Sequence, residues 1–103
     1  MRQFDVFPNP SARSRTAVPY IVVMQSHFLD ELTTALIAPL VREPQSGDFS
    51  RVSVAIEFEG ERLHASLAEM APILRASLRQ AVGNISTHEF SIRRALDRLF
   101  TGF

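Results

Sequence analysis

The end of the chain carries the pattern that most restricts the fold. Apolar side chains recur there at intervals of three and four residues, as on one face of an α-helix; they are Ile92, Ala95, Leu96, Leu99, Phe100 and Phe103. Ser86 with Glu89 three residues later has the sequence signature of a capping box, which predicts where the helix begins. Gly102 predicts where it ends. We therefore expect an amphipathic C-terminal helix that packs one face on the rest of the chain.

Upstream of this helix, several segments have the patterns of β-strands. Residues 51–58 alternate apolar and polar side chains, and the turn at Glu59 and Gly60 joins them to residues 62–66, which predicts a hairpin. Residues 3–7 also alternate and end at Pro8. Residues 18–25 form a continuous apolar run, which is typical of a strand buried on both faces or covered by a partner subunit. Polar stretches at 9–16 and 43–50 predict loops.

Two segments carry conflicting signals. Residues 28–38 keep a helical spacing of apolar side chains, yet Thr33 and Thr34 weaken a helix and Pro39 would end it. Residues 67–82 also keep helical spacing, with Pro72 in the middle. Local propensity favours helix in the second segment, and it leaves the first one open.

Composition restricts the classes of function. The chain has 103 residues, which predicts one domain over 1–103. Its 11 basic and 11 acidic side chains balance, so the sequence favours protein partners over an electrostatic hold on nucleic acid. The absence of cysteine excludes disulfides, thiolate metal sites and thiol nucleophiles. No signal-peptide pattern or membrane-length apolar run occurs, so we expect a soluble cytoplasmic protein without membrane contact.

The residues that could carry chemistry do not form a familiar pattern. The three histidines lack metal-ligand spacing, and no glycine-rich loop is present. Ser26, His27 and Asp30 contain the groups of a nucleophile, a base and a carboxylate. Adjacent strand residues point to opposite faces, however, so we interpret these three as a loop entry. We expect no catalytic residues, no metal and no cofactor. The aromatic chain end is the unusual feature, because Phe103 must enter a core or meet a partner.

Five segments, taken in order, resemble the CcdB family of bacterial toxins. They are QFDVF, YIVVMQSHFLD, LIAPL, AEMAPIL and the closing ISTHEFSIRRALDRLFTGF. The resemblance covers almost the whole chain. It implies a mostly β fold with an antiparallel sheet and one C-terminal α-helix, the small SH3-like barrel shared by CcdB and MazF toxins. On this template residues 71–78 form a strand and residues 28–34 form a bend.

The resemblance also implies a function. Members of the family are homodimeric toxins of type II toxin–antitoxin systems that bind the DNA gyrase A subunit and trap gyrase on cleaved DNA, without acting as enzymes. The positions that match the gyrase-binding residues are Phe28, Leu29, Asp97, Phe100, Thr101, Gly102 and Phe103. The implied dimer interface contains Tyr20, Val22, Leu99, Phe100 and Phe103. Thr101 stands where the family pattern has Trp, Asp97 where Asn is frequent, and Phe103 where Ile occurs.

Further partners follow from the same resemblance. A cognate CcdA-like antitoxin would neutralise the toxin with a disordered segment, and operator DNA would be bound only through that antitoxin. Two alternatives remain at this point. A MazF-like endoribonuclease would share the barrel and would need a basic groove, for which Arg13, Arg15 and Arg42 are the candidates. A family member without toxicity would act as a co-repressor in the antitoxin complex.

Overall fold

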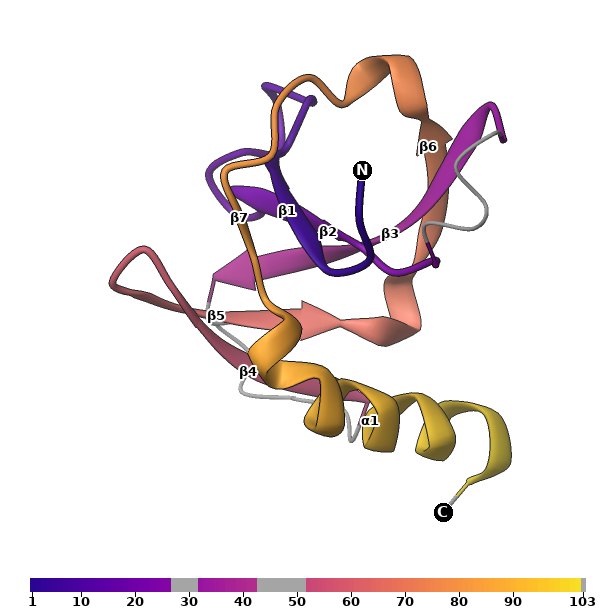
Figure 1. Ribbon diagram of the computed structural model, residues 1–103. Coiled ribbons are helices and arrows are strands. Elements are labelled where there is room, and N and C mark those ends of the chain that lie inside the picture. The colour runs from indigo at the N-terminus through magenta and orange to yellow at the C-terminus, as the bar shows by residue number, and fades with distance from the viewer. Residues whose placement is uncertain (27–31, 43–51, 103) are drawn as a thin grey trace.

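The computed structural model describes residues 1–26, 32–42 and 52–102. Within them, a β-sheet is followed by one C-terminal α-helix (Figure 1). The elements are β1 (Asp5–Pro8), β2 (Tyr20–Val23), β3 (Thr34–Arg42), β4 (Ser53–Phe58), β5 (Glu61–Ser66), β6 (Ala71–Leu74), β7 (Gly83–Asn84) and α1 (Glu89–Thr101). No helix among these residues is long and apolar enough to cross a bilayer.

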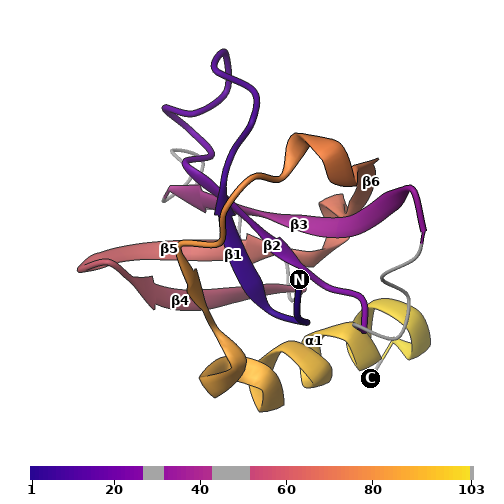
Figure 2. The same ribbon diagram turned by 45° about the horizontal axis from the view of Figure 1, so that its top comes forward.

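All strand pairs of this sheet are antiparallel, in the order β4-β5-β3-β2-β1-β7. The long strand β3 has a second partner, because its first half pairs with β6 and its last residues pair with β5. Leu36 therefore lies opposite Pro72, and Leu40 opposite Ala65. This branching curls the sheet into a half-barrel (Figures 1 and 2). The mostly β, SH3-like barrel with one C-terminal helix is confirmed.

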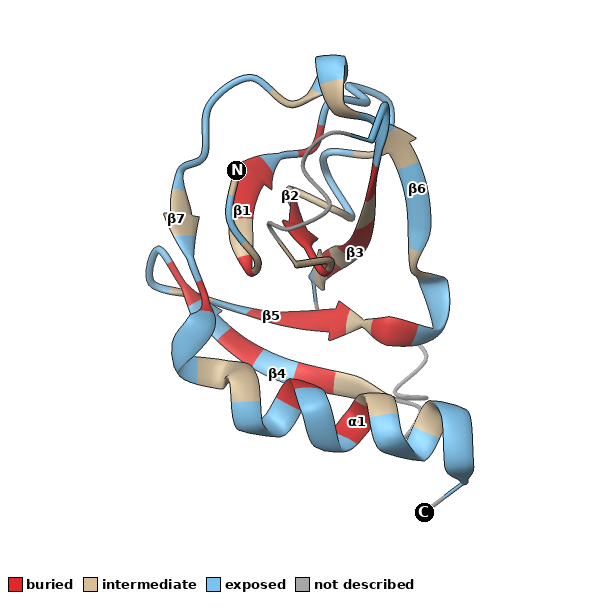
Figure 3. Ribbon diagram, turned by 45° about the vertical axis from the view of Figure 1, so that its right-hand side comes forward, coloured by how far each residue is buried: buried red, intermediate tan, exposed pale blue. Residues whose placement is uncertain are grey.

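The strand β2 is buried on both faces within a single chain. Because strand side chains alternate, Val22 enters the larger core with Leu40 and Ile56, whereas Ile21 and Val23 enter a second core on the opposite face. Figure 3 shows buried residues in each of the strands β1 to β5, and β2 is buried at three of its four positions. Of the two explanations for the apolar run, the strand buried on both faces is the one found, and no partner subunit is needed to cover it.

The helix α1 packs on the outer strands of the sheet through a narrow stripe. Ile92 and Ala95 are buried in the larger core, and Leu96 packs against it from the side. Phe100 lies outside this stripe and is exposed, so the predicted apolar face is wrong at that position. Gly102 ends the helix as predicted, since its φ is 80° and its N–H donates to the Arg98 carbonyl at 2.9 Å.

The predicted capping box does not form. Residues Ser86–His88 make a 3₁₀ turn before α1, and no side chain caps the helix. Glu89 instead accepts a bond from Arg93, with an Nε–Oε2 distance of 2.7 Å. The Ser86 N–H donates to Oδ1 of Asn84 at 2.8 Å, so the turn draws its polar contact from the preceding strand.

Each of the two ambiguous segments contains a strand, and its bounds differ from the predicted ones. Thr34, predicted in a bend, already belongs to β3, and positions 28–31 of that predicted bend lie outside the described residues. The predicted strand over 71–78 stops at Leu74, and Arg75–Ser77 form a 3₁₀ turn. The backbone N–H of Arg75 donates to the Thr33 carbonyl at 3.0 Å. Thr33 directly precedes β3, so β6 has reached the end of its partner strand at this point.

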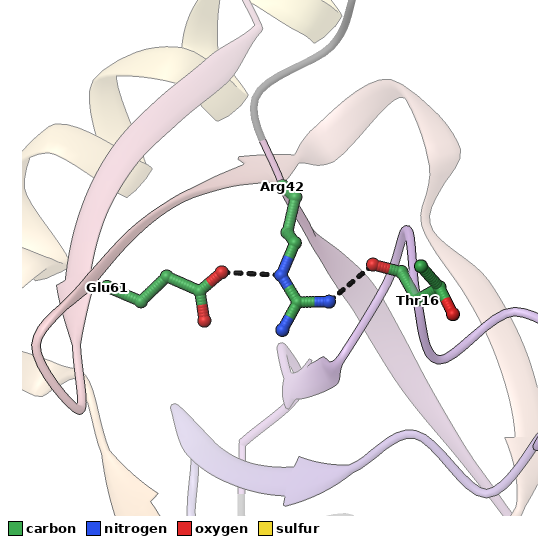
Figure 4. A network of polar contacts seen from close by, with 3 residues as sticks. All are labelled: Thr16, Arg42 and Glu61. Atoms are coloured by element: carbon green, nitrogen blue, oxygen red, sulfur yellow. Dashed lines mark hydrogen bonds and ion pairs between the residues drawn. The ribbon is translucent and has the colours of Figure 1, made fainter.

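A polar contact ties the first loop to the β4–β5 hairpin (Figure 4). Arg42, at the end of β3, donates through Nε to Oε2 of Glu61 at 2.5 Å and through Nη1 to the Thr16 carbonyl. The bond to Glu61 raises the pKa of Arg42 above its ordinary value. A raised pKa keeps the guanidinium of Arg42 charged to a more alkaline pH than an arginine without such a partner.

Candidate functional site

The outer side of α1 presents apolar area that the protein does not cover itself. Because Ile92 and Ala95 face the core, helical periodicity turns Phe90 toward solvent, with Asp97 about 20° away around the helix. The side chain of Phe90 is 73% exposed and that of Phe100 is 75% exposed. Two phenylalanines left this exposed on one helix are typical of a protein–protein contact.

The charged side chains of α1 are partly engaged by their neighbours. The Arg94 guanidinium carbon lies 5.9 Å from the centroid of the Phe90 ring, a cation–π distance. Arg93 is held by Glu89 one turn earlier. These contacts place positive charge beside the exposed Phe90, so the surface combines an aromatic centre with a polar rim, as protein interfaces do.

The last turn of α1 is closed by its own backbone. The Thr101 hydroxyl donates to the Asp97 carbonyl at 2.5 Å, one turn earlier in the same helix. Gly102 then adopts the left-handed conformation. Thr101 and Gly102 are both exposed. The last turn of α1 is therefore a defined surface that is available to a partner.

The structure brings four of the predicted gyrase-binding residues together. Asp97, Phe100, Thr101 and Gly102 all lie exposed on the final turns of α1 and directly after it. Phe28, Leu29 and Phe103 lie outside the described residues.

The predicted dimer residues do not share one environment. Tyr20 is half-buried and meets Phe58 edge to face, with ring centroids 5.0 Å apart. Val22 is fully buried within its own chain. Leu99 is half-buried and Phe100 is exposed. Among the described residues predicted for the dimer, Phe100 is exposed, and Tyr20 and Leu99 keep part of their surface.

Phe90 is the residue that the sequence interpretation missed. Phe90 falls outside the apolar stripe from which the helix was predicted. Helical spacing could have identified it. Phe90 and Asp97 are seven residues apart, which is about two turns, so both lie on the side of the helix opposite the apolar stripe. A large aromatic opposite a buried stripe marks a surface that the folded chain leaves for something else.

Metal chemistry finds no support in the described part of the chain, where no group of three or more His, Asp or Glu side chains could hold an ion. Of the three residues considered as a nucleophile, base and carboxylate, His27 and Asp30 lie outside the described ranges.

Comparison with known proteins gives a family for this architecture. The sequence model of the CcdB protein family matches residues 3–102, a range that contains every described strand and α1. No curated protein matches the chain.

Proposed function

Because the chain belongs to the CcdB family, whose members are toxins of type II toxin–antitoxin systems, we propose that it binds the DNA gyrase A subunit and traps gyrase on cleaved DNA. The observation that carries the proposal is the exposed end of α1, where Phe100 is 75% exposed beside Thr101 and Gly102. An aromatic anchor on a rigid helix turn loses little side-chain entropy on binding, so most of its buried area contributes to affinity.

The proposed active form is a homodimer. A two-fold toxin would present two copies of the α1 end to the two-fold gyrase A dimer, which doubles the contact without a new site. Leu99, Phe100 and Phe103 are the proposed contributors from the helix end, and Tyr20 the contributor from the sheet. Phe28 and Leu29 are proposed to add to the gyrase contact.

The proposed mechanism makes or breaks no covalent bond in the toxin. The protein would wedge against gyrase while the DNA is cleaved and oppose religation. A CcdA-like antitoxin would reverse this by folding a disordered segment over the toxin, and would carry the complex to operator DNA. All of these steps would take place in the cytoplasm, where gyrase works.

The ribonuclease alternative loses a candidate residue. Arg42 would have to contact RNA phosphates, yet its guanidinium is bound by Glu61 and the Thr16 carbonyl (Figure 4). The zero net charge also gives no general attraction to RNA. The co-repressor alternative has one specific observation in its favour, which is Thr101 at the position of the family's Trp.

The test is gyrase-mediated cleavage of supercoiled plasmid by purified bacterial gyrase with this protein. We expect wild type to accumulate linear DNA, and a chain that lacks residues 101–103 to accumulate none. Phe100→Ala should weaken cleavage strongly. Leu74→Ala, at a leucine 57% exposed on β6, is the matched control and should not change it. A folded wild type that yields no linear DNA would refute gyrase poisoning for that enzyme and would favour the co-repressor.

A further inference from the structure

A cleft opens where the pairing of β1 with the last strand stops. Val6 lies opposite Gly83, and the Val82 N–H donates to the Val6 carbonyl at 2.7 Å. Every second residue of β1 turns its backbone groups toward β7, and the next one after Val6 is Pro8. Proline has no N–H to donate. The ladder therefore cannot continue, and the chain before β7 separates from β1. The resulting cleft has a volume of about 870 Å³, which is large enough for a few residues of peptide.

Both walls of the cleft lie at the end of the molecule opposite α1 (Figures 1 and 2). One wall is the loop after β1, which contributes Pro8, Pro10 and Arg15, and the other is residues 76–82. The cleft is therefore separate from the outer face of α1, so a molecule bound there would not cover Phe90 or Phe100.

The loop wall is held in place by a buried asparagine. Asn9 is 6% exposed, and its Nδ2 donates to the Ser14 hydroxyl at 2.9 Å and to the Val18 carbonyl at 2.8 Å. Arg15 in turn donates through Nε to the Asn9 carbonyl at 2.6 Å, which positions its guanidinium at the cleft. A preformed wall of this kind lowers the entropy lost on binding.

The cleft combines positive charge with apolar surface. Its charged lining residues are Arg15 on the loop wall and Arg79 on the other, and its lining contains no Asp or Glu. Val82 is a large apolar side chain that stays 43% exposed there, next to the two prolines. In a chain of zero net charge, two arginines without a carboxylate between them create a local site for anions.

We propose that this cleft binds an extended acidic peptide segment, with carboxylates on Arg15 and Arg79 and an aliphatic side chain against Val82. Guanidinium groups bind carboxylates with two parallel hydrogen bonds, which favours a peptide carboxylate over a diffuse negative surface. The edge of β7 is also the end of the sheet order, so an extended chain meets an open strand edge beside the cleft. The source of the segment is the antitoxin, an assignment that rests on the proposed function.

The experiment uses a defined probe, a fluorescein-labelled octapeptide that alternates glutamate and valine, with a lysine–valine octapeptide as its charge-reversed control. Fluorescence anisotropy with the full chain should show binding of the acidic peptide only. Arg79→Glu should weaken it by at least about tenfold, the loss of one charge-assisted pair plus repulsion. Arg13→Glu changes an exposed arginine that lies in the loop after β1, near Arg15, but does not line the cleft, and it should leave affinity within about twofold.

Four outcomes decide the proposal. Loss of binding in Arg79→Glu with retention in Arg13→Glu supports it, provided that circular dichroism shows both variants folded. Equal weakening in both variants, or no binding to wild type, overturns it. Displacement of the peptide by cognate antitoxin supports the antitoxin as the source. Antitoxin binding that leaves the peptide in place overturns that source, while the cleft and the gyrase proposal both survive.

Discussion

At position 83, the ring of Phe58 leaves room for no side chain larger than hydrogen. A Cβ built on Gly83 would lie 2.5 Å from Cε1 and 2.8 Å from Cζ of that ring. The ring has little freedom to retreat, because it is buried and meets Tyr20 edge to face. We expect Gly83→Ala to lower the free energy of unfolding by about 1–3 kcal/mol, the usual cost of overpacking, as measured by urea denaturation.

The clash with Phe58 makes its own control possible. In a Phe58→Leu background the ring is absent, so Gly83→Ala should cost clearly less there than in the wild type. The same cost in both backgrounds would show that the backbone conformation, and not the ring, restricts position 83.

By the resemblance to the family pattern, Thr101 stands where a Trp is expected. The residue is exposed, and its hydroxyl donates to the Asp97 carbonyl one turn earlier. An indole at this position would add apolar area next to Phe100 for a partner to bury. We expect Thr101→Trp to lower the concentration for half-maximal gyrase cleavage by about tenfold or more, with the unfolding free energy unchanged within about 0.5 kcal/mol.

A tryptophan placed elsewhere on the surface distinguishes a specific gyrase contact at position 101 from nonspecific binding by an exposed indole. Thr87 is exposed in the turn before α1, at the opposite end of the helix. Thr87→Trp should therefore leave gyrase cleavage as it is. Equal potency of wild type and Thr101→Trp would mean that position 101 does not contact gyrase.

At the scale of elements, the buried face of α1 stabilises the fold, and its exposed side carries the proposed gyrase contact. Ile92 is completely buried against the sheet, whereas Phe100 on the same helix is exposed. Ile92→Ala should cost about 2–5 kcal/mol of stability through the cavity it creates, and Phe100→Ala should cost within about 0.5 kcal/mol. Gyrase cleavage assayed at a temperature where both variants are folded should show the reverse order. A large stability loss in Phe100→Ala would place its ring in a core.

The elements that the sequence predicted well are those that local contacts determine. The hairpin of β4 and β5 was recoverable because alternation and turn chemistry lie within a few residues, and Glu59 and Gly60 do adopt positive φ values of 53° and 74°. The early end of β6 was not recoverable, because it depends on where β3, over thirty residues earlier, begins. The capping box failed for a similar reason, since Asn84 on β7 competes for the Ser86 N–H.

The candidate surfaces also differ in how far the sequence could predict them. The exposed end of α1 could be anticipated from helical spacing and from the family resemblance, and Phe90 could have been found by the same spacing. The acidic-peptide cleft could not, because it exists only where β1 and the chain before β7 separate at Pro8. Nothing in the local sequence around Arg79 shows that Arg15 lies on the facing wall.

At the scale of the whole molecule, the half-barrel closes its apolar surface within one chain. Two cores on the two faces of β2 account for the buried apolar residues. The large apolar side chains that stay exposed among the described residues lie on α1, on β6, at the cleft and at Leu32, just before β3. A homodimer would therefore have to form through surface residues and not through a shared core. This leaves two surfaces that single substitutions can separate without unfolding the chain: the end of α1, which the proposed gyrase and dimer contacts share, and the cleft.

The charge balance of the whole chain gives the last prediction, which concerns operator DNA. With 11 basic and 11 acidic side chains, the protein has no net charge with which to displace the counterions of a duplex. We expect the protein alone to produce no mobility shift of its operator fragment, even at about 50 mM salt, where electrostatic binding is strong. Addition of the antitoxin should produce a shift, and the salt dependence of that shift should equal that of the antitoxin's own phosphate contacts. A shift by the protein alone would instead mean that its arginines form a DNA-binding surface, and would require the antitoxin-only route to DNA to be abandoned.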